Sequence, residues 1–266
     1  MSRQFTRDFG VEVQRGNIAG FGAVNKFGRN SEIDAGVIAD VWDGGNTGDV
    51  SLIWVAPTQA RTHTIASTSG NDTDGGTGAN TVRIFGLTSW DANEVSEDVT
   101  MDSGSPPVTA NSYVIIHRMR VLTFGNAGPN VGTITATATS DGTITAQIGI
   151  GPPKEGQTQM AIYGIPSTQK AYMKRLYASL NRASGAGTST GYIDLFLCFN
   201  PIPNSQLAGF LVKETKGLSL DGMSAFSDLY PIAKTFDGPG ILKIQIASGT
   251  NNMDISAGFD LYLVDN

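Results

Sequence analysis

The chain has 266 residues and a formal net charge of −6, which argues against a protein that binds duplex nucleic acid, since neutralisation of phosphates dominates that affinity. Cys198 is the single cysteine, so an intrachain disulfide and a cysteine-based zinc site are both excluded. The 33 glycines and the low share of charged residues, 16%, are typical of short strands joined by many turns.

The sequence has no apolar run close to the ~20 residues that a membrane-spanning helix requires. Its first residues also lack the apolar core of a signal peptide. We therefore expect synthesis in the cytoplasm.

Residues 1–34 form a glycine-rich, basic segment with no steady period of either 2 or 3.6. Such a segment has too little clustered apolar surface to fold alone, but several phenylalanines are poorly suited to a merely solvated tail. We predict an extended N-terminal arm that docks onto a neighbouring molecule. The alternative is a leader with one or two phenylalanines packed on its own domain. The residues expected to contact the partner are Arg3, Phe5, Arg7, Phe9, Arg15, Phe21, Lys26, Phe27 and Arg29.

Residues 35–153 predict a first β-sandwich domain. The spacing of its apolar runs and turn-rich stretches is that of sandwiches and barrels. Trp42 and Trp54 are expected to fill core or an interface. The strands are expected over residues 50–57, 62–68, 80–87, 94–101 and 111–123.

The run from Thr133 to Gln147 predicts a β-hairpin. Its Thr and Ile residues favour extended backbone, and Asp141-Gly142 suits a two-residue type I′ turn. Because side chains alternate along a strand, the face that carries Ile134 should point inward. The apolar residues of that face are Ile134, Ala136 and Ala138.

Pro152 and Pro153 lie in the best candidate domain boundary, and residues 154–266 predict a second, jelly-roll-like sandwich. The run 193–199 is apolar on both faces, so it should be a central strand. In the run 240–247, Lys243 alternates with apolar residues, which predicts a strand with one wet face. The strands are expected over residues 159–165, 170–181, 191–200, 210–216, 226–236, 240–247 and 256–264.

The fold class predicted from the whole chain is all-β. It consists of two antiparallel β-sandwiches of jelly-roll or Greek-key type, preceded by the extended arm.

No pattern in the sequence forms a convincing active site. The two histidines, His63 and His117, each lie in a predicted strand without a nucleophile motif beside them. Asp72 and Asp74, in the run 71–78, are weak candidates for Ca²⁺ ligands. The alternative is a solvated loop whose polar side chains bond their own backbone. We expect neither catalysis nor a cofactor.

Short β and turn signatures follow one another along nearly the whole chain, in the segments 26–30, 41–45, 65–79, 81–87, 96–101, 130–136, 159–166, 172–182 and 258–266. In their order and spacing they resemble a widespread family of virion structural proteins from tailed phages, mostly marine ones. The run 30–34 lacks the Asn-Pro that often follows the Phe-Gly-Arg of this family, and 103–107 replaces a more polar turn.

This resemblance implies a non-enzymatic virion protein, and we expect a capsid decoration or cement protein that binds the outer surface of the head shell and stabilises it. The expected partners are the major capsid protein and further copies of the chain itself, with a trimer favoured over a dimer. Nucleic acid and membranes are not expected partners. The expected location is the surface of the virion head, after synthesis in the host bacterial cytoplasm.

Two alternatives stay open. The first is a tail adaptor or a receptor-binding adhesin of the same particle. The second is a carbohydrate-binding or depolymerase module, which needs aromatic platforms and carboxylates in one cleft. The sequence shows only scattered tryptophans, Trp42, Trp54 and Trp90.

Overall fold

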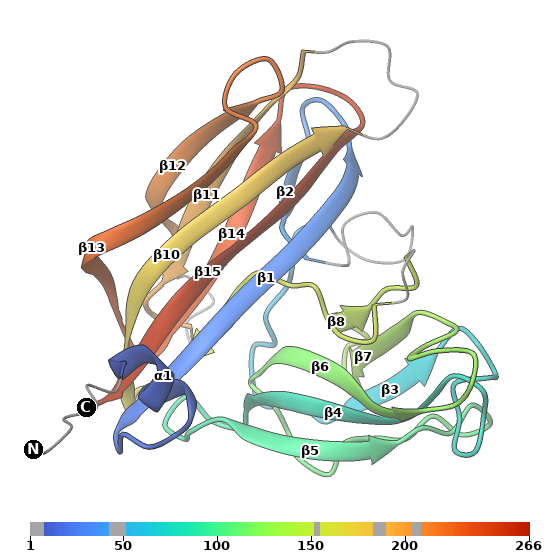
Figure 1. Ribbon diagram of the computed structural model, residues 1–266. Helices are drawn as coiled ribbons and strands as arrows, with labels where there is room; N and C mark the ends of the chain where they lie inside the picture. Colours follow the sequence, from blue (N-terminus) through green and yellow to red (C-terminus); the bar gives the residue numbers. More distant parts are fainter. Residues whose placement is uncertain (1–7, 43–51, 152–154, 183–189, 204–208) are drawn as a thin grey trace, which may run out of the picture.

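The computed structural model describes residues 8–42, 52–151, 155–182, 190–203 and 209–266. Within these ranges the chain is nearly all β, with fifteen strands in several antiparallel sheets and a single helix of 6 residues (Figure 1). None of the helical residues described forms a helix long and apolar enough to cross a membrane.

Nine strands form the larger part of the molecule, which we call the large unit. Its four-stranded sheet has the order β1 (Phe21–Ile33), β15 (Met253–Asp265), β10 (Gln169–Arg182) and β13 (Ala225–Asp237). Its five-stranded sheet has the order β12 (Leu211–Ser219), β11 (Tyr192–Asn200), β14 (Gly240–Ser248) and β2 (Ile38–Asp40), and β9 (Ile162–Ile165) pairs with β14. Both sheets contribute to one hydrophobic core, which includes Met173, Phe259 and Ile244.

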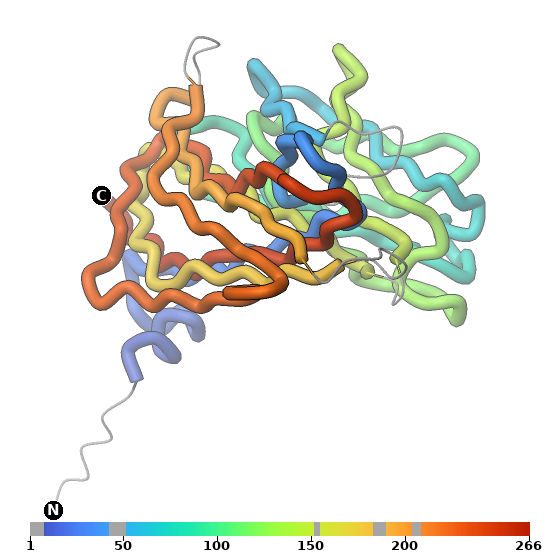
Figure 2. Tube along the Cα trace, turned by 90° about the horizontal axis from the view of Figure 1, so that it is seen from above, coloured from blue at the N-terminus to red at the C-terminus, as the bar shows by residue number. Residues whose placement is uncertain are grey.

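Six strands form the small unit, which lies beside the large unit (Figure 2). One sheet has the order β3 (His63–Ser67), β7 (Ile134–Ala138) and β8 (Ile144–Ile148), and the other has the order β5 (Val95–Thr100), β4 (Ala79–Leu87) and β6 (Ile115–Phe124). These sheets share a second core, in which Trp42 and Trp54 are buried as predicted.

Most predicted strands lie where the structure has them. β11 is central, between β12 and β14, as its apolar faces predicted. In β7 the buried residues are Ile134, Ala136 and Ala138, so the predicted inward face of the hairpin is confirmed. The strand predicted over 50–57 is not present in its described part, residues 52–57.

The turn of this hairpin is longer than predicted. The Ala138 N–H donates to the Thr143 carbonyl at 2.8 Å, so residues 139–142 form the loop. Gly142 has a positive φ of 74°, and the Asp141 carboxylate accepts from the Thr143 N–H at 3.0 Å. The side-chain bond of Asp141 to nearby backbone supports this wider turn.

The segment predicted to be a free arm is, from residue 21, a strand of the chain's own sheet. β1 pairs with β15 in antiparallel register from Phe21 to Asn30. The sequence of β1 does not alternate between apolar and polar residues, because buried positions of the strand carry Lys26 and Asn30 instead of apolar residues. Gly28 lies so close to its neighbours that a Cβ there would be 2.5 Å from the Val41 carbonyl oxygen.

The helix α1 (Phe9–Gln14) precedes β1 and lies against the outer face of the four-stranded sheet (Figure 1). Asp8 caps it, accepting from the Val11 N–H at 3.1 Å. The Phe9 ring contacts the rings of Phe21 and Tyr262 edge-on, at centroid distances of 5.4 and 5.8 Å. The described part of the predicted arm therefore packs on its own chain.

The predicted domain boundaries at residues 34 and 153 need correction for the same reason. β1 and β2 pair with β15 and β14, so these two strands belong to the large unit together with the strands from β9 to β15. The small unit runs from β3 to β8, which ends at Ile148. The second predicted boundary lies close to this end, although the Thr158 N–H still donates to the Met119 carbonyl of β6 at 3.0 Å.

The prediction that one face of β14 is exposed to solvent was wrong for Lys243. Lys243 is only 2% exposed, because its ammonium pairs with Asp40 of β2 and lies 4.1 Å from the centre of the Phe210 ring. The Lys243 ammonium lies 2.8 Å from the Asp40 carboxylate. Asp40 also accepts from the Trp54 N–H at 2.9 Å and from the Gln245 amide at 3.1 Å. This buried ion pair fixes β2 against β14 and holds the chain segment that leads to the small unit.

Candidate functional site

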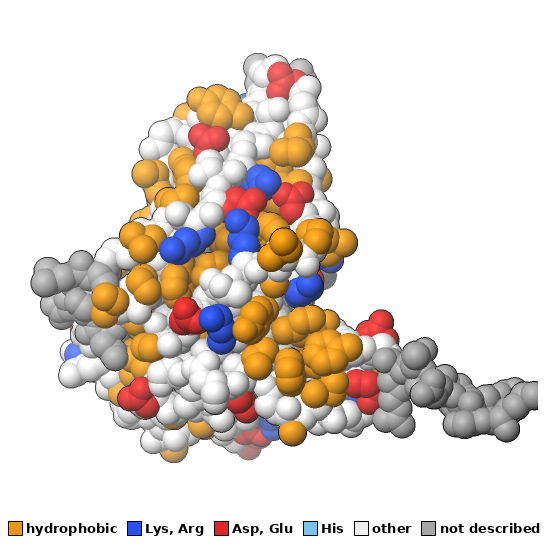
Figure 3. Space-filling model, turned by 90° about the vertical axis from the view of Figure 1, so that its left-hand side faces the viewer, with side chains coloured by type: hydrophobic (Ala, Val, Ile, Leu, Met, Phe, Trp, Pro, Cys, Tyr) orange, Lys and Arg blue, Asp and Glu red, His pale blue; other side chains and the backbone are white. Residues whose placement is uncertain are grey.

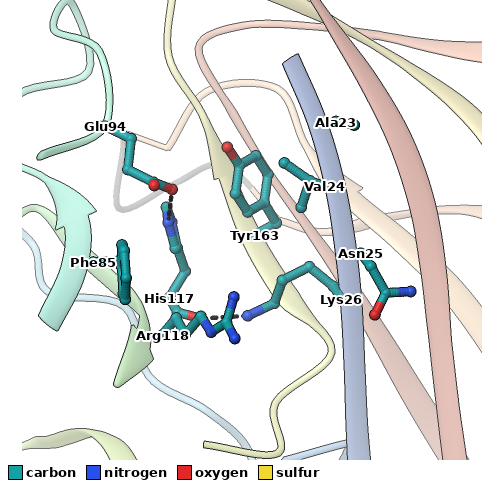
Figure 4. Close-up of a pocket in the computed structure, with 9 residues that line it drawn as sticks. All are labelled: Ala23, Val24, Asn25, Lys26, Phe85, Glu94, His117, Arg118 and Tyr163. Carbon is teal, nitrogen blue, oxygen red and sulfur yellow. Dashed lines mark hydrogen bonds and ion pairs between the residues drawn. The ribbon is translucent and has the colours of Figure 1, made fainter. Parts of the chain in front are cut away.

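A cavity of about 150 Å³ lies where β1 of the large unit faces the small unit (Figure 4). β1 contributes one wall, β4 and β6 contribute the opposite one, and β9 contributes a tyrosine. Charged and polar side chains from these separate strands meet here. The lining residues are Ala23, Val24, Asn25, Lys26, Phe85, Glu94, His117, Arg118 and Tyr163.

Lys26 extends from β1 across the cavity toward β6 (Figure 4). Its residue is only 6% exposed, and its ammonium donates a hydrogen bond to the His117 backbone carbonyl. Burial, reinforced by repulsion from the Arg118 guanidinium, lowers the pKa of Lys26 to about 7. The sequence predicted this lysine at a partner surface, but the structure places it inside the chain's own interior.

His117 joins the cavity to Glu94 at its edge. The imidazole Nε2 lies 2.5 Å from a Glu94 carboxylate oxygen. Burial lowers the pKa of His117, so we assign a neutral ring whose Nε2–H donates to Glu94. Its Nδ1 has no hydrogen-bond partner among the described residues.

The Glu94 carboxyl is partly exposed and ionised. Burial is the largest single influence and would raise the pKa of Glu94, but the hydrogen bond from His117 and the attraction of His117, Lys26 and Arg118 together lower it below its ordinary value. The Tyr163 ring packs against the His117 ring at a centroid distance of 4.5 Å. Burial raises the pKa of Tyr163 above its ordinary value, so its phenol stays protonated.

Arg118 places a second cation beside Lys26 (Figure 4). Its Nη2 donates to the Gln157 amide oxygen at 3.0 Å, and its guanidinium lies 5.6 Å from the centre of the Phe85 ring. The cavity thus brings together an ammonium, a guanidinium and one carboxylate that is already bonded to His117.

His63 lies apart from this cavity, in the small unit. It is fully buried, and neither ring nitrogen has a hydrogen-bond partner among the described residues. Burial lowers the pKa of His63 to about 4, so the ring is neutral at pH 7. The described part of the chain holds no group of three or more His, Cys, Asp or Glu side chains arranged for a metal ion.

The candidate Ca²⁺ ligand Asp72 is fully buried, and its carboxylate is already hydrogen-bonded. Oδ1 accepts from the backbone N–H groups of Ala79 at 2.8 Å and Val131 at 2.9 Å. Oδ2 accepts from the Ser67 hydroxyl at 2.6 Å and the Gly132 N–H at 2.7 Å. Donor hydrogens therefore point at both oxygens, so the geometry fits a loop anchor and not a cation ligand.

Asp74 is exposed. Among the described residues, it does not form a cluster of metal-ligating side chains with Asp72. The loop reading of the run 71–78, which the sequence left as the alternative, agrees with these contacts. Gly78 is part of the same anchor, because a Cβ at this residue would be 2.0 Å from the Asp72 Oδ1.

The residues predicted to contact a partner are not gathered in one place. Phe9 and Phe21 remain 48% and 37% exposed on the outer face of the four-stranded sheet. Arg15 ends α1 and forms an ion pair with Glu12. Phe27 and Arg29 lie in β1 with Lys26. Arg3, Phe5 and Arg7 lie outside the described residues.

A second surface lies where the edge strands β12 and β13 of the two large sheets meet, and we call it the β12–β13 edge. Ion pairs connect these strands, with Lys216 of β12 lying 2.8 Å from Asp228 of β13 and Glu214 of β12 lying 3.2 Å from Lys234 of β13. Figure 3 faces this side of the molecule and shows apolar side chains interspersed with both signs of charge. Those more than half exposed on the two strands are Leu211, Val212, Leu229 and Ile232.

A broader groove of about 550 Å³ lies on the outer face of the four-stranded sheet, beside α1. Asn25 and Asp260 share its floor, and they pair directly across β1 and β15. Arg175 lies 3.9 Å from the Asp260 carboxylate and stacks over the Tyr177 ring at 4.7 Å. Leu229 lines this groove as well, so the groove adjoins the β12–β13 edge.

Sequence patterns had no means of finding the cavity. Lys26 and His117 lie far apart in the sequence. A sequence also does not distinguish a buried lysine from an exposed one. The only available signal was the lack of alternation in residues 21–33. A sheet strand with polar residues at its inward positions gives that pattern when those residues reach a polar interface.

The buried position of Lys26 predicts a specific pH dependence of stability. The pKa of Lys26 is about 7 in the folded chain and about 10.4 in an unfolded one. Between these values the unfolded chain binds more protons, so the free energy of unfolding should rise with pH by up to roughly 1.4 kcal/mol per unit. We expect Lys26→Met to abolish this rise between pH 7.5 and 9.

Urea unfolding in chloride buffers at several pH values measures the effect. Lys213→Met removes the same charge from an exposed site and should leave the slope unchanged. A slope in Lys26→Met equal to that of the unmodified protein would contradict the prediction.

No protein-family model matches the chain, and no curated protein sequence is significantly similar to it. Among solved structures, a chain of the mosquito-larvicidal Cry4Aa toxin from Bacillus thuringiensis is 11% identical with a TM-score of 0.21, over 71% of this chain and 42% of the toxin chain. A chain of the infectious bursal disease virus Gt strain is 9% identical with a TM-score of 0.23, over 92% of this chain and 73% of that chain. This chain spans less than half of the toxin chain, and likenesses this low carry no argument about function.

Proposed function

We propose that this chain is a non-enzymatic structural protein of a phage particle, a decoration or cement protein that binds the outer surface of the head shell and stabilises it. The proposal includes two β-sandwiches of jelly-roll or Greek-key type as its fold. It includes the major capsid protein as a partner and self-association, with a trimer favoured. The distributed sequence resemblance supports it, and so does the character of the molecular surface.

The observation that carries the proposal is the apolar β12–β13 edge. Ile232 is 90% exposed and Leu229 is 73% exposed, on a strand that ends a sheet. Edge strands of independent proteins are commonly protected by charges, proline or a cover, since an apolar edge invites association. Here the exposed apolar residues stand beside the paired charges of Lys216 and Asp228, an arrangement typical of an interface with a polar rim.

A substitution at this edge tests self-association. We expect the unmodified protein to elute as an oligomer of the 28.0 kDa chain, and Ile232→Asp combined with Leu229→Asp to elute as a monomer, because a buried unpaired carboxylate is costly. Size-exclusion chromatography with light scattering measures the masses, and circular dichroism confirms folding. Val108→Asp, at a residue 52% exposed on the small unit, is the matched control and should not change the mass.

The location of the chain tests the virion assignment itself. We expect the protein in purified particles of its phage, with hundreds of copies per head and the β12–β13 edge in contact with another chain. Mass spectrometry gives the copy number, and a reconstruction of the whole particle gives the position. Absence from purified particles, together with a monomeric mass at all concentrations, would refute the proposal.

The groove on the four-stranded sheet supports a second candidate, a receptor-binding adhesin that recognises carbohydrate. Tyr262 lines this groove and pairs with Tyr172 across β15 and β10, two residues along β15 from Asp260, which pairs with Arg175. Aromatic rings beside carboxylate and amide groups are suited to sugars. A dozen or fewer copies per particle, with glycan-array binding that Tyr172→Ala and Arg175→Ala abolish, would favour this candidate over the head protein.

A further inference from the structure

The cavity between the two units carries an excess of positive charge in a buried place. Lys26 and Arg118 face each other there, and each is desolvated, which lowers both pKa values. The one carboxylate at the edge, that of Glu94, accepts the hydrogen bond of a neutral His117. Like charges that are wholly or partly desolvated repel each other, and the Glu94 carboxylate, which attracts both cations, supplies one negative charge against two positive ones.

The same cavity has hydrogen-bond donors to spare. An ammonium has three N–H donors, and Lys26 uses one of them on the His117 carbonyl, its only hydrogen-bond partner among the residues that the structure describes. The protonated phenol of Tyr163 also belongs to the lining (Figure 4). Two cationic donors, Lys26 of β1 and Arg118 of β6, and one neutral donor, Tyr163 of β9, thus line a space of about 150 Å³.

We propose that this cavity is a binding site for a small oxyanion, of the size of phosphate or acetate, held by Lys26, Arg118 and Tyr163. An oxyanion supplies the acceptors and the negative charge that these donors lack, and charge-assisted hydrogen bonds are the stronger kind. The bound anion bridges β1 of the large unit and β6 of the small unit, so it fastens the two units together. The inference is independent of whether the chain is a virion protein.

Thermal unfolding and isothermal titration of the full chain with inorganic phosphate and with acetate test the site, at pH 6.5 in a chloride buffer of constant ionic strength. We expect a saturable rise in the melting temperature, roughly 3–5 °C, and one oxyanion bound per chain. Added chloride at the same ionic strength should give no rise. Comparison of the two oxyanions distinguishes a site for a tetrahedral phosphate from one for a carboxylate.

Variants of the lining give the specific readout. Lys26→Met should weaken oxyanion binding by roughly 10- to 100-fold, because it removes a charged donor. Lys213→Met removes an exposed charge and should bind like the unmodified protein. Glu94→Gln keeps an acceptor for His117 but removes the negative charge, so it should tighten binding several-fold. Tyr163→Phe should weaken binding while it preserves packing.

The proposal is overturned if neither oxyanion stabilises the protein, which would mean that the cavity holds water alone. It is also overturned if Lys26→Met and Tyr163→Phe keep the unmodified affinity, which would place the anion elsewhere. Should Lys26→Met fail to fold, the opposite shifts expected for Glu94→Gln and Tyr163→Phe decide the question. The affinity for acetate, which stays ionised throughout, should also fall from pH 6.5 to 8.5 as Lys26 loses its proton, since Arg118, Glu94, His117 and Tyr163 keep their charge states across that range.

Discussion

Replacement of Asp72 by alanine is expected to destabilise the protein by about 4 kcal/mol, because a buried donor left without its acceptor costs about 1–3 kcal/mol. The carboxylate of Asp72 accepts from the N–H groups of Ala79, Val131 and Gly132 and from the Ser67 hydroxyl. These donors come from separate parts of the small unit, so the loss should loosen the unit as a whole. Urea unfolding followed by tryptophan fluorescence measures the change, since Trp42 and Trp54 lie in the core of that unit.

Two comparisons isolate the anchoring role of Asp72. Asp72→Asn keeps the shape but turns an NH₂ toward donor groups, so its cost should be smaller than that of alanine yet still large. Asp74→Ala, at an exposed neighbour in the same loop, should cost no more than about 0.5 kcal/mol. Addition of Ca²⁺ should stabilise none of these proteins. An Asp72→Ala variant as stable as the unmodified protein would show that the hydrogen bonds carry no net free energy.

Replacement of Asp40 by alanine should cost about 3–5 kcal/mol, the typical effect of removing one partner of a buried ion pair. The Lys243 ammonium, 3% exposed, would lose its carboxylate partner at 2.8 Å, and the Trp54 N–H and the Gln245 amide would lose their acceptor. The Phe210 ring, 4.1 Å from the Lys243 ammonium, would remain as a weaker partner. Chemical unfolding gives the free energies.

A double-mutant cycle separates the pair from its surroundings. The combination Asp40→Asn with Lys243→Met should be less destabilising than the sum of the two single changes, because it leaves no unpaired buried charge. Lys170→Met breaks a pair with Asp237 of the same length, 2.8 Å, at an exposed site, and should cost at most about 1 kcal/mol. Additive effects at Asp40 and Lys243 would contradict the coupling.

The sequence predicted the strands well where one face is apolar and the other polar. Ile134 and Ala136 alternate with threonines, and the structure buries them as that alternation requires. The apolar run of β11 likewise predicted its central place. These predictions depend only on neighbours along the strand, and neighbours are what a sequence pattern records.

The predictions failed where the environment of a residue comes from a distant part of the chain. Lys243 alternates with apolar residues, which is the pattern of a strand with one solvent-exposed face. It is nevertheless buried, because the Asp40 carboxylate supplies its counter-charge. Lys26 belongs to a segment without any alternation, and its surroundings are supplied by β6 and β9. The Asp72 loop was recognised as a loop, whereas its four donors could not be foreseen. The candidate site is therefore largely a product of tertiary structure.

The pairing of β1 with β15 has a consequence for biosynthesis. β15 lies between β1 and β10 in the four-stranded sheet, so β1 must wait until residues 253–265 have left the ribosome before its hydrogen-bonding partner exists. In the described part of the chain, the sheets of the small unit are built from strands between residues 63 and 148, so their pairing can begin while translation continues. Deletion of the residues that form β15 would leave β1 without a paired strand and β10 paired with β13 alone, so the synthesis of β15 is the step that commits the four-stranded sheet to its native order.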